Sequence, residues 1–212
     1  MFHTNSTKSV VFFENTLKEL NLTVERKLLL TAIAAFIVAE LKSDKTVNLN
    51  FVCTHNSRRS QLAQVWAHFA IDYFQLKNIF SFSGGTEATA FFSNTVKTLQ
   101  EVGFEFHLKD FSHQNPVYEI STKKMKNNII GFSKLYNHQI NQKPFIAITT
   151  CSDAEENCPF IPDTIRRFQL PFNDPKTADN TPNSLETYKK TSRLIAGEIG
   201  FILENVRNSI PS

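Results

Sequence analysis

The sequence lacks an apolar run long enough to cross a membrane. Its longest apolar stretch, residues 28–41, is interrupted by Thr31 and ends around Glu40, and it falls short of the roughly 20 residues that a membrane-spanning helix requires. A secretory signal would carry its apolar stretch near the start, whereas this chain opens on the polar residues 3–6. We therefore predict a cytoplasmic protein with no membrane partner.

The net charge is small, and cysteines are few. A net charge of +3 over 212 residues gives no reason to expect nucleic acid as a partner, although it is compatible with a small anionic substrate. The three cysteines, Cys53, Cys151 and Cys158, cannot all pair with one another, and cytosolic thiols are kept reduced. We therefore expect them to be catalytic or redox-active rather than structural.

Strand patterns alternate with helix patterns along the chain, which predicts an α/β fold with a central parallel sheet flanked by helices. Ligands of such sheets lie at the carboxyl ends of the strands. The helical segments are expected at residues 9–43, with Thr23 as an N-cap, and at 59–74, 93–102 and about 181–207. The strands are expected at residues 47–53, 79–83 and 145–150.

This pattern divides the chain into an N-terminal helical extension, residues 1–46, and a catalytic domain, residues 47–212. Residues 111–143 are expected to form an insertion, because Asn-Pro and Asn-Asn pairs interrupt short apolar pieces there. The apolar stripe of the extension is typical of a helix packed on the flank of the domain. A homodimer contact is the alternative.

A cysteine at the end of a predicted strand and an arginine six positions later indicate an oxyanion-binding loop. Backbone N–H groups in such a loop point at an anion, and the start of the following helix adds partial positive charge. The same field stabilises a thiolate, which would make Cys53 a nucleophile. Arg59 supplies a planar fork for two oxygens of a tetrahedral oxyanion, and the Ser60 hydroxyl could donate a hydrogen bond to the Cys53 sulfur. The alternative is an inert buried cysteine and an ordinary first-turn arginine.

The loop resembles that of low-molecular-weight tyrosine phosphatases and, more closely, that of thioredoxin-coupled arsenate reductases, two groups that share a fold. The sequence departs from the family pattern twice. His55 stands where glycine is common, and Arg58 stands where the reductases often have a further cysteine. The resemblance implies that the oxyanion is bound by Thr54, His55, Asn56, Ser57, Arg58, Arg59 and Ser60.

A polar segment that follows the strand predicted at 145–150 contains the second and third cysteines. Cys151 and Cys158 lie seven residues apart, and on a flexible loop they could close into a disulfide after a local rearrangement; two unrelated buried thiols are the alternative. Neither their spacing nor a nearby histidine pair fits zinc, and we predict no metal and no cofactor. The segment resembles the redox segment of the thioredoxin-coupled reductases, which the phosphatases lack.

Asp174 precedes a proline and matches the aspartate-proline loop of the same family, where the aspartate is the general acid for the departing oxygen. By spacing alone, Asp174 could be only a turn residue. The resemblance implies an arsenate reductase in which Cys53, Cys151 and Cys158 form a relay that thioredoxin reduces. One alternative is a phosphatase that hydrolyses phosphotyrosine through a phosphocysteine, and another is a non-catalytic module that binds an oxyanion or senses redox state.

Overall fold

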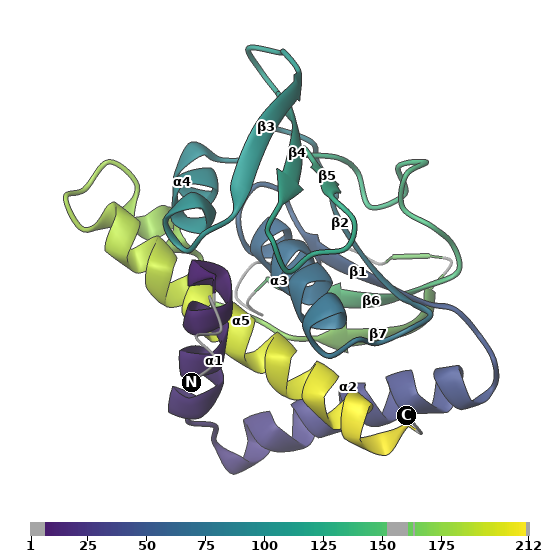
Figure 1. Cartoon of the computed structure of the whole chain (residues 1–212). Coiled ribbons are helices and arrows are strands. Elements are labelled where there is room, and N and C mark those ends of the chain that lie inside the picture. The colour runs from purple at the N-terminus through teal and green to yellow at the C-terminus, as the bar shows by residue number, and fades with distance from the viewer. Residues whose placement is uncertain (1–6, 152–160, 163, 211–212) are drawn as a thin grey trace.

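A four-stranded parallel sheet lies at the centre of the fold (Figure 1). The computed structural model describes residues 7–151, 161–162 and 164–210. The strands of this sheet run in the order β2-β1-β6-β7, and every neighbouring pair is parallel. They are β1 (Val47–Cys53), β2 (Ile79–Gly85), β6 (Phe145–Thr149) and β7 (Thr164–Gln169). The predicted parallel sheet is confirmed, and β7 is a strand that the sequence pattern did not predict.

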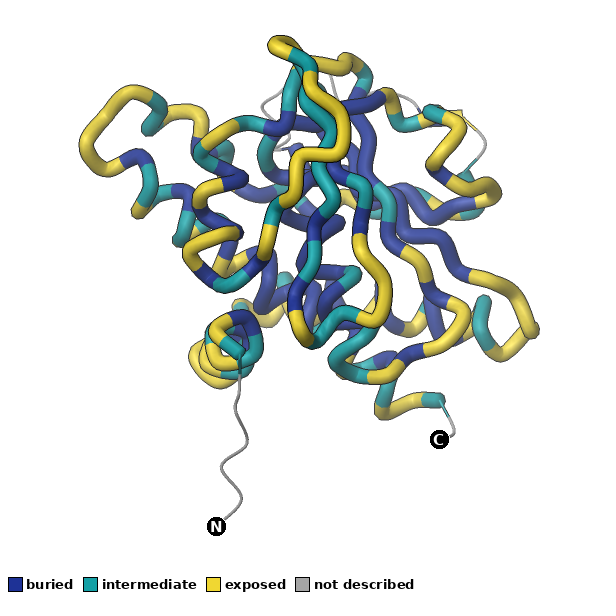
Figure 2. Tube along the Cα trace, turned by 45° about the horizontal axis from the view of Figure 1, so that its top comes forward, coloured by how far each residue is buried: buried dark blue, intermediate teal, exposed yellow. Residues whose placement is uncertain are grey.

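Strand β1 is buried along its whole length, because both faces of the sheet are covered. On one face, Leu49 and Phe51 join the main apolar core that the helices share. On the other face, Val52 packs in a smaller cluster with Ala147 and Ile161. Figure 2 shows the central strands as buried and the outer loops as largely exposed. The sequence of β1 nevertheless alternates, because Asn48 and Asn50 are buried on this second face, where Asn48 Nδ2 donates to the Pro144 carbonyl at 2.9 Å.

Five α-helices surround this sheet within the described part of the chain. Residues 9–43 are helical as predicted, in two helices that residues 20–23 separate. Thr23 caps the second of them, as predicted, because its Oγ1 accepts a hydrogen bond from Arg26 N at 3.2 Å. The helices are α1 (Lys8–Glu19), α2 (Val24–Lys42), α3 (Arg59–Tyr73), α4 (Ser93–Glu101) and α5 (Ser184–Ser209). Helix α5 begins three residues later than predicted, because residues 181–183 form a turn.

Helix α1 packs into the main core between α3 and α5. Phe13 is fully buried, and its ring stacks on Trp66 at 6.0 Å and meets Phe69 edge-on at 5.3 Å. A Cβ at Gly200 of α5 would lie 2.7 Å from Leu17 Cδ2, so the absence of a side chain there permits the close approach of the two helices. The N-terminal helices therefore share one apolar core with the parallel sheet.

A second, antiparallel sheet has two of its strands in the region read as an insertion and one strand just before that region. Its strands are β3 (Glu105–Asp110), β4 (Val117–Ser121) and β5 (Ile129–Gly131), in the order β3-β4-β5. These strands were not predicted, because they are short and only partly buried, so they lack a clear alternation. The connection that follows covers the far face of the parallel sheet, where Asn50 Nδ2 donates to the Tyr136 carbonyl at 3.0 Å. None of the helices in the described ranges is long and apolar enough to cross a membrane.

Candidate active site

The connection from β1 to α3 holds the predicted oxyanion loop. Cys53 ends β1 with 5% of its surface exposed, and Arg59 begins α3 with 3% exposed. Asn56, between them, has a left-handed backbone with a φ of 45°. Within the described chain, the N–H groups of residues 55–58 donate to no other protein atom. The loop therefore presents several backbone donors next to the Cys53 thiol at the start of a helix, which suits a bound anion.

A chain of hydrogen bonds fixes the orientation of the Ser60 hydroxyl toward the thiol. Asn56 Nδ2 donates to Ser60 Oγ at 2.9 Å, and Ser60 Oγ lies 3.0 Å from Cys53 Sγ. A thiolate has no hydrogen, so in the anionic form of Cys53 the Ser60 hydroxyl is the donor of this bond. Donation from Ser60 stabilises the thiolate.

Arg59 and Asp174 meet at the mouth of the loop. Arg59 Nη2 donates to Asp174 Oδ2 at 2.7 Å, and Nη1 donates to the Phe172 carbonyl at 2.9 Å. Asp174 also caps the short 3-10 helix η1 (Pro175–Ala178), because its Oδ1 accepts from Lys176 N at 3.0 Å. The surrounding pocket has a volume of about 260 Å³. It is lined by Cys53, Thr54, His55, Ser57, Arg58, Arg59, Asp174 and Lys176.

The second cysteine lies beside the same loop. Cys151 follows β6 and is 3% exposed, and its Sγ lies 3.9 Å from Thr54 Oγ1. The preceding residue is fixed against the end of β1, because Thr150 N donates to the Val52 carbonyl at 2.8 Å. Cys158, the predicted third cysteine, lies in segment 152–160, outside the described residues.

His55, which stands where glycine is common in the family, lies outside the left-handed region of the backbone. The left-handed residue of the loop is its neighbour Asn56, a residue type that adopts this conformation readily. The His55 carbonyl accepts hydrogen bonds from Ser133 Oγ at 2.8 Å and Thr89 Oγ1 at 3.2 Å. Its ring is partly exposed and lies 3.4 Å from a Glu87 carboxylate oxygen.

Sequence reasoning missed the side-chain partners of Arg58. Its Nε donates to the Tyr188 hydroxyl at 2.6 Å, its Nη2 donates to Asp179 Oδ2 at 2.7 Å, and its guanidinium lies 4.0 Å from the centre of the Phe92 ring. Burial acts to lower the pKa of Arg58, but hydrogen bonds and charge from Tyr188 and Asp179 raise it above the ordinary value. Both partners lie more than 100 positions along the chain, so no local pattern could have indicated them. Arg58 thereby ties the loop to α5 and to the segment that follows Asp174.

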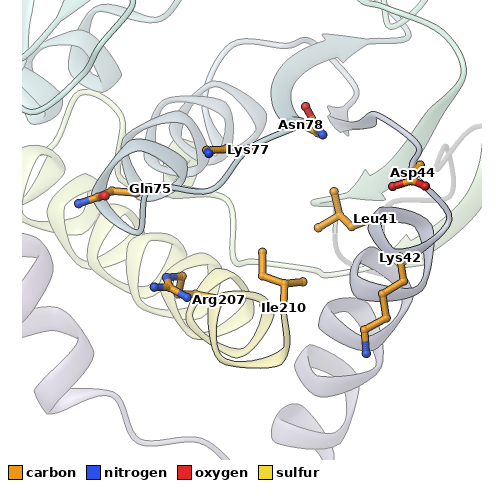
Figure 3. Close-up of a pocket in the computed structure, with 8 residues that line it drawn as sticks. All are labelled: Leu41, Lys42, Asp44, Gln75, Lys77, Asn78, Arg207 and Ile210. Carbon is orange, nitrogen blue, oxygen red and sulfur yellow. The ribbon is translucent and has the colours of Figure 1, made fainter. Parts of the chain in front are cut away.

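A larger cavity of about 650 Å³ lies away from this loop. Figure 3 shows its lining residues at the ends of α2 and α5 and in the connection from α3 to β2. They are Leu41, Lys42, Asp44, Gln75, Lys77, Asn78, Arg207 and Ile210. The cavity adjoins the amino ends of the parallel strands and contains none of the predicted site residues. Across the part of the chain that the structure describes, no group of three or more His, Cys, Asp or Glu side chains is arranged to hold a metal ion.

Comparison with curated proteins finds bacterial arsenate reductases. The chain is 33% identical over 141 residues to an arsenate reductase of Bacillus licheniformis, a match that covers 66% of this chain and 80% of the relative. It is 30% identical over 132 residues to an arsenate reductase of Bacillus subtilis, which covers 62% of this chain and 76% of the relative. No known family profile matches the chain.

Comparison with solved structures gives two weaker similarities. An arsenate reductase in a phosphate-binding state aligns with a TM-score of 0.47 and 20% identity, over 78% of this chain and 99% of that chain. A low-molecular-weight phosphotyrosine phosphatase from Vibrio cholerae aligns with a TM-score of 0.47 and 16% identity, over 74% and 94%. The sequence identity with the two Bacillus relatives, rather than these alignments, establishes the relationship. The chain belongs to the family of arsenate reductases and low-molecular-weight tyrosine phosphatases.

Proposed function

We propose that this protein reduces arsenate to arsenite, with Cys53 as the nucleophile and a thiol-disulfide relay that delivers the oxidation to thioredoxin. The observation that carries this proposal is the buried second thiol, since Cys151 Sγ lies 3.9 Å from Thr54 Oγ1 of the oxyanion loop. A phosphatase completes its cycle with water and has no use for that thiol. The two Bacillus relatives at 30–33% identity are arsenate reductases, which supports the same substrate.

The first step joins arsenic to the Cys53 sulfur. The Cys53 thiolate attacks arsenic(V), an arsenic–sulfur bond forms, and one arsenic–oxygen bond breaks. Asp174 protonates the departing oxygen, since an expelled oxide requires a proton. Arg59 and the loop N–H groups hold the remaining oxygens, whose negative charge they stabilise. Asp174 and Arg59 are suited to act together because their side chains are 2.7 Å apart.

The second step reduces the arsenic. The Cys151 thiolate attacks Cys53 Sγ, the arsenic–sulfur bond breaks, and its electron pair stays on arsenic, which leaves as arsenite in the +3 state. A Cys53–Cys151 disulfide remains. Cys158 then attacks Cys151 and releases the Cys53 thiolate, and the two thiols of reduced thioredoxin restore Cys151 and Cys158. Each exchange requires an accessible thiolate and no cofactor. The role proposed for Cys158 rests on the resemblance of its segment to the redox segment of the thioredoxin-coupled reductases.

Arsenate-dependent oxidation of reduced thioredoxin tests this proposal. We expect turnover by the wild type, none by Cys53→Ser, and inhibition by inorganic phosphate, which competes for the same loop. Cys53→Ser tests the nucleophile because a hydroxyl is far less nucleophilic than a thiolate at neutral pH. A wild-type protein that leaves thioredoxin reduced in the presence of arsenate would overturn the assignment.

Hydrolysis of phosphate esters is the second candidate, and one observation favours it. A groove of about 530 Å³ adjoins the loop and extends past Thr89, Phe92 and Gln114. This space exceeds what a bare oxyanion occupies, and it would accept the organic group of an ester. Efficient hydrolysis of tyrosyl phosphate, with arsenate leaving every thiol reduced, would identify a phosphatase. Tight phosphate binding with neither activity would identify a binding module.

A further inference from the structure

Lys134 carries a buried charge that the proposed chemistry has not used. The residue follows β5 and is 2% exposed. Its Nζ lies 3.4 Å from Ser83 Oγ, 3.5 Å from the Phe132 carbonyl oxygen and 4.9 Å from the centre of the Phe132 ring. Among the residues that the structure describes, no carboxylate forms an ion pair with it. A buried ammonium without an anionic partner is destabilising, so its presence calls for a compensating role.

The backbone N–H of Lys134 contacts Asn56, a central residue of the oxyanion loop. Lys134 N donates to Asn56 Oδ1 at 2.9 Å. Gln61 Nε2 donates to the same Asn56 oxygen at 3.1 Å and to the Phe132 carbonyl at 2.8 Å. The Phe132 carbonyl is also the group that Lys134 Nζ approaches. The ammonium and Asn56 therefore belong to one hydrogen-bond network, which continues through Ser60 to the Cys53 sulfur.

The side chain of Lys134 contacts Ser83, which links β2 to α3. Ser83 Oγ donates to Gln64 Oε1 at 2.6 Å, so its single hydrogen is used and its oxygen accepts from Lys134 Nζ. The groups that face the ammonium are thus a hydroxyl, a carbonyl and an aromatic ring. Each is a weak partner, and positive charge remains uncompensated behind the loop.

We propose that Lys134 is a positioning residue: its backbone N–H fixes Asn56 and through it the Ser60–Cys53 hydrogen bond, and its buried ammonium stabilises negative charge on the thiolate and the bound oxyanion. Burial lowers the pKa of Lys134 to about 7. An anion in the loop opposes this effect, because a nearby negative charge favours the protonated amine. The inference deepens the proposed function, and it concerns the nucleophile rather than arsenic chemistry.

The test measures Cys53 directly and requires no turnover. Alkylation of Cys53 by iodoacetamide is followed by peptide mass spectrometry at neutral pH, and inorganic phosphate is titrated to protect the thiol. Lys134→Met keeps the length of the side chain and removes its charge. We expect Cys53 alkylation to slow by about tenfold and phosphate protection to require about tenfold more phosphate, the effect of losing one nearby charge. Lys97→Met, at an exposed lysine of α4, is the matched control and should behave as wild type.

Chemical rescue separates charge from packing. Lys134→Ala opens space for a small cation, so ammonium chloride should restore both the alkylation rate and phosphate protection, whereas choline chloride at equal ionic strength should not. Should Lys134→Met fail to fold, the alanine variant carries the same test. Wild-type values in Lys134→Met, or an alanine defect that ammonium leaves unchanged, would overturn the inference. If Lys134→Met has the expected defects in alkylation and phosphate protection but the wild type does not reduce arsenate, only the proposed function is refuted.

Discussion

Arg59 Nη2 and Asp174 Oδ2 lie 2.7 Å apart, and this contact joins the anion-binding side chain to the proposed proton donor. Arg59 is nearly buried, whereas about a quarter of the Asp174 side chain is exposed. The Arg59 guanidinium is also held by the Phe172 carbonyl. The pair therefore has one buried member and one that solvent and substrate can reach, which suits an anion clamp and an accessible acid.

Arg59→Lys tests the clamp. A lysine ammonium is a point charge and cannot give the paired hydrogen bonds of a guanidinium. We expect phosphate binding to weaken by about 1.5–3 kcal/mol, the contribution of a hydrogen bond to a charged group. Isothermal titration with phosphate measures the loss. Arg193→Lys, at an exposed arginine of α5, is the control, and equal affinity in the two variants would contradict the assigned role.

Asp174→Asn tests the acid. Asparagine preserves the shape and can still accept a hydrogen bond from Arg59, but it has no acidic proton. We expect a single-turnover rate of arsenate-dependent Cys53–Cys151 disulfide formation lower by roughly 10²–10⁴, the range for a positioned general acid, with phosphate affinity changed far less. Asp110→Asn, in an exposed strand of the antiparallel sheet, serves as control. An unchanged rate would leave Asp174 as a turn residue.

Lys134→Met tests the buried charge through stability. The pKa of Lys134 in the folded protein is lowered from 10.5 to about 7. Between pH 7 and pH 10.5, Lys134 is protonated in the unfolded chain but largely neutral in the folded protein. The free energy of unfolding should therefore rise with pH across this window. Methionine removes the group, and we expect a higher free energy of unfolding at and below neutral pH with a flatter rise above it. Urea denaturation at about pH 6.5 and about pH 9.5 measures both effects. A methionine variant less stable than wild type at the lower pH would contradict this reading.

The elements that carry the loop were predictable because their signals are local. The bounds of β1 matched the prediction, and α3 begins at the predicted Arg59. A buried strand, a polar turn and the start of a helix follow one another within about fifteen residues, and no distant contact is needed to recognise them. The antiparallel sheet escaped prediction because its strands are short and only partly buried, so their sequences show no clear alternation.

The partners of the loop could not be predicted, because they depend on tertiary contacts. Arg58 meets Asp179 and Tyr188 only after α5 has packed against α3. Lys134 stands in a mixed sequence between Ser133 and Leu135, and only the folded chain reveals that its charged side chain is buried. Spacing indicated the nucleophile and the arginine, whereas the side chains that position them come from elements distant in the sequence.

Phe13→Ala tests the contribution of the N-terminal helices. The ring is fully buried against Trp66 and Phe69, so its loss should lower the free energy of unfolding by about 3–5 kcal/mol. Catalysis by the folded fraction should be near normal, since no predicted site residue precedes Cys53. Val11→Ala, at an exposed position of the same helix, should change stability by less than about 0.5 kcal/mol. A Phe13→Ala protein that is fully folded and inactive would show that α1 acts on the site.

The relay distinguishes a reductase from a phosphatase, and its two later cysteines should fail at different steps. Cys158→Ser should release one arsenite for each enzyme and then stop, because Cys53 and Cys151 suffice for the first disulfide. Cys151→Ser should release none, since no thiol is then in place to attack the Cys53 sulfur. Rapid quenching with arsenite quantification measures this burst.

The same two variants provide an internal control for the loop. Both should keep whatever phosphate-ester hydrolysis the wild type shows, because hydrolysis requires only water to attack the intermediate on Cys53. Mass spectrometry of the arsenate-treated wild type should find Cys151 joined to Cys158, and reduced thioredoxin should restore the thiols. A full burst from Cys151→Ser would exclude Cys151 as the second nucleophile, since its Sγ, 3.9 Å from Thr54 Oγ1, would then lie beside the loop without taking part in the reduction.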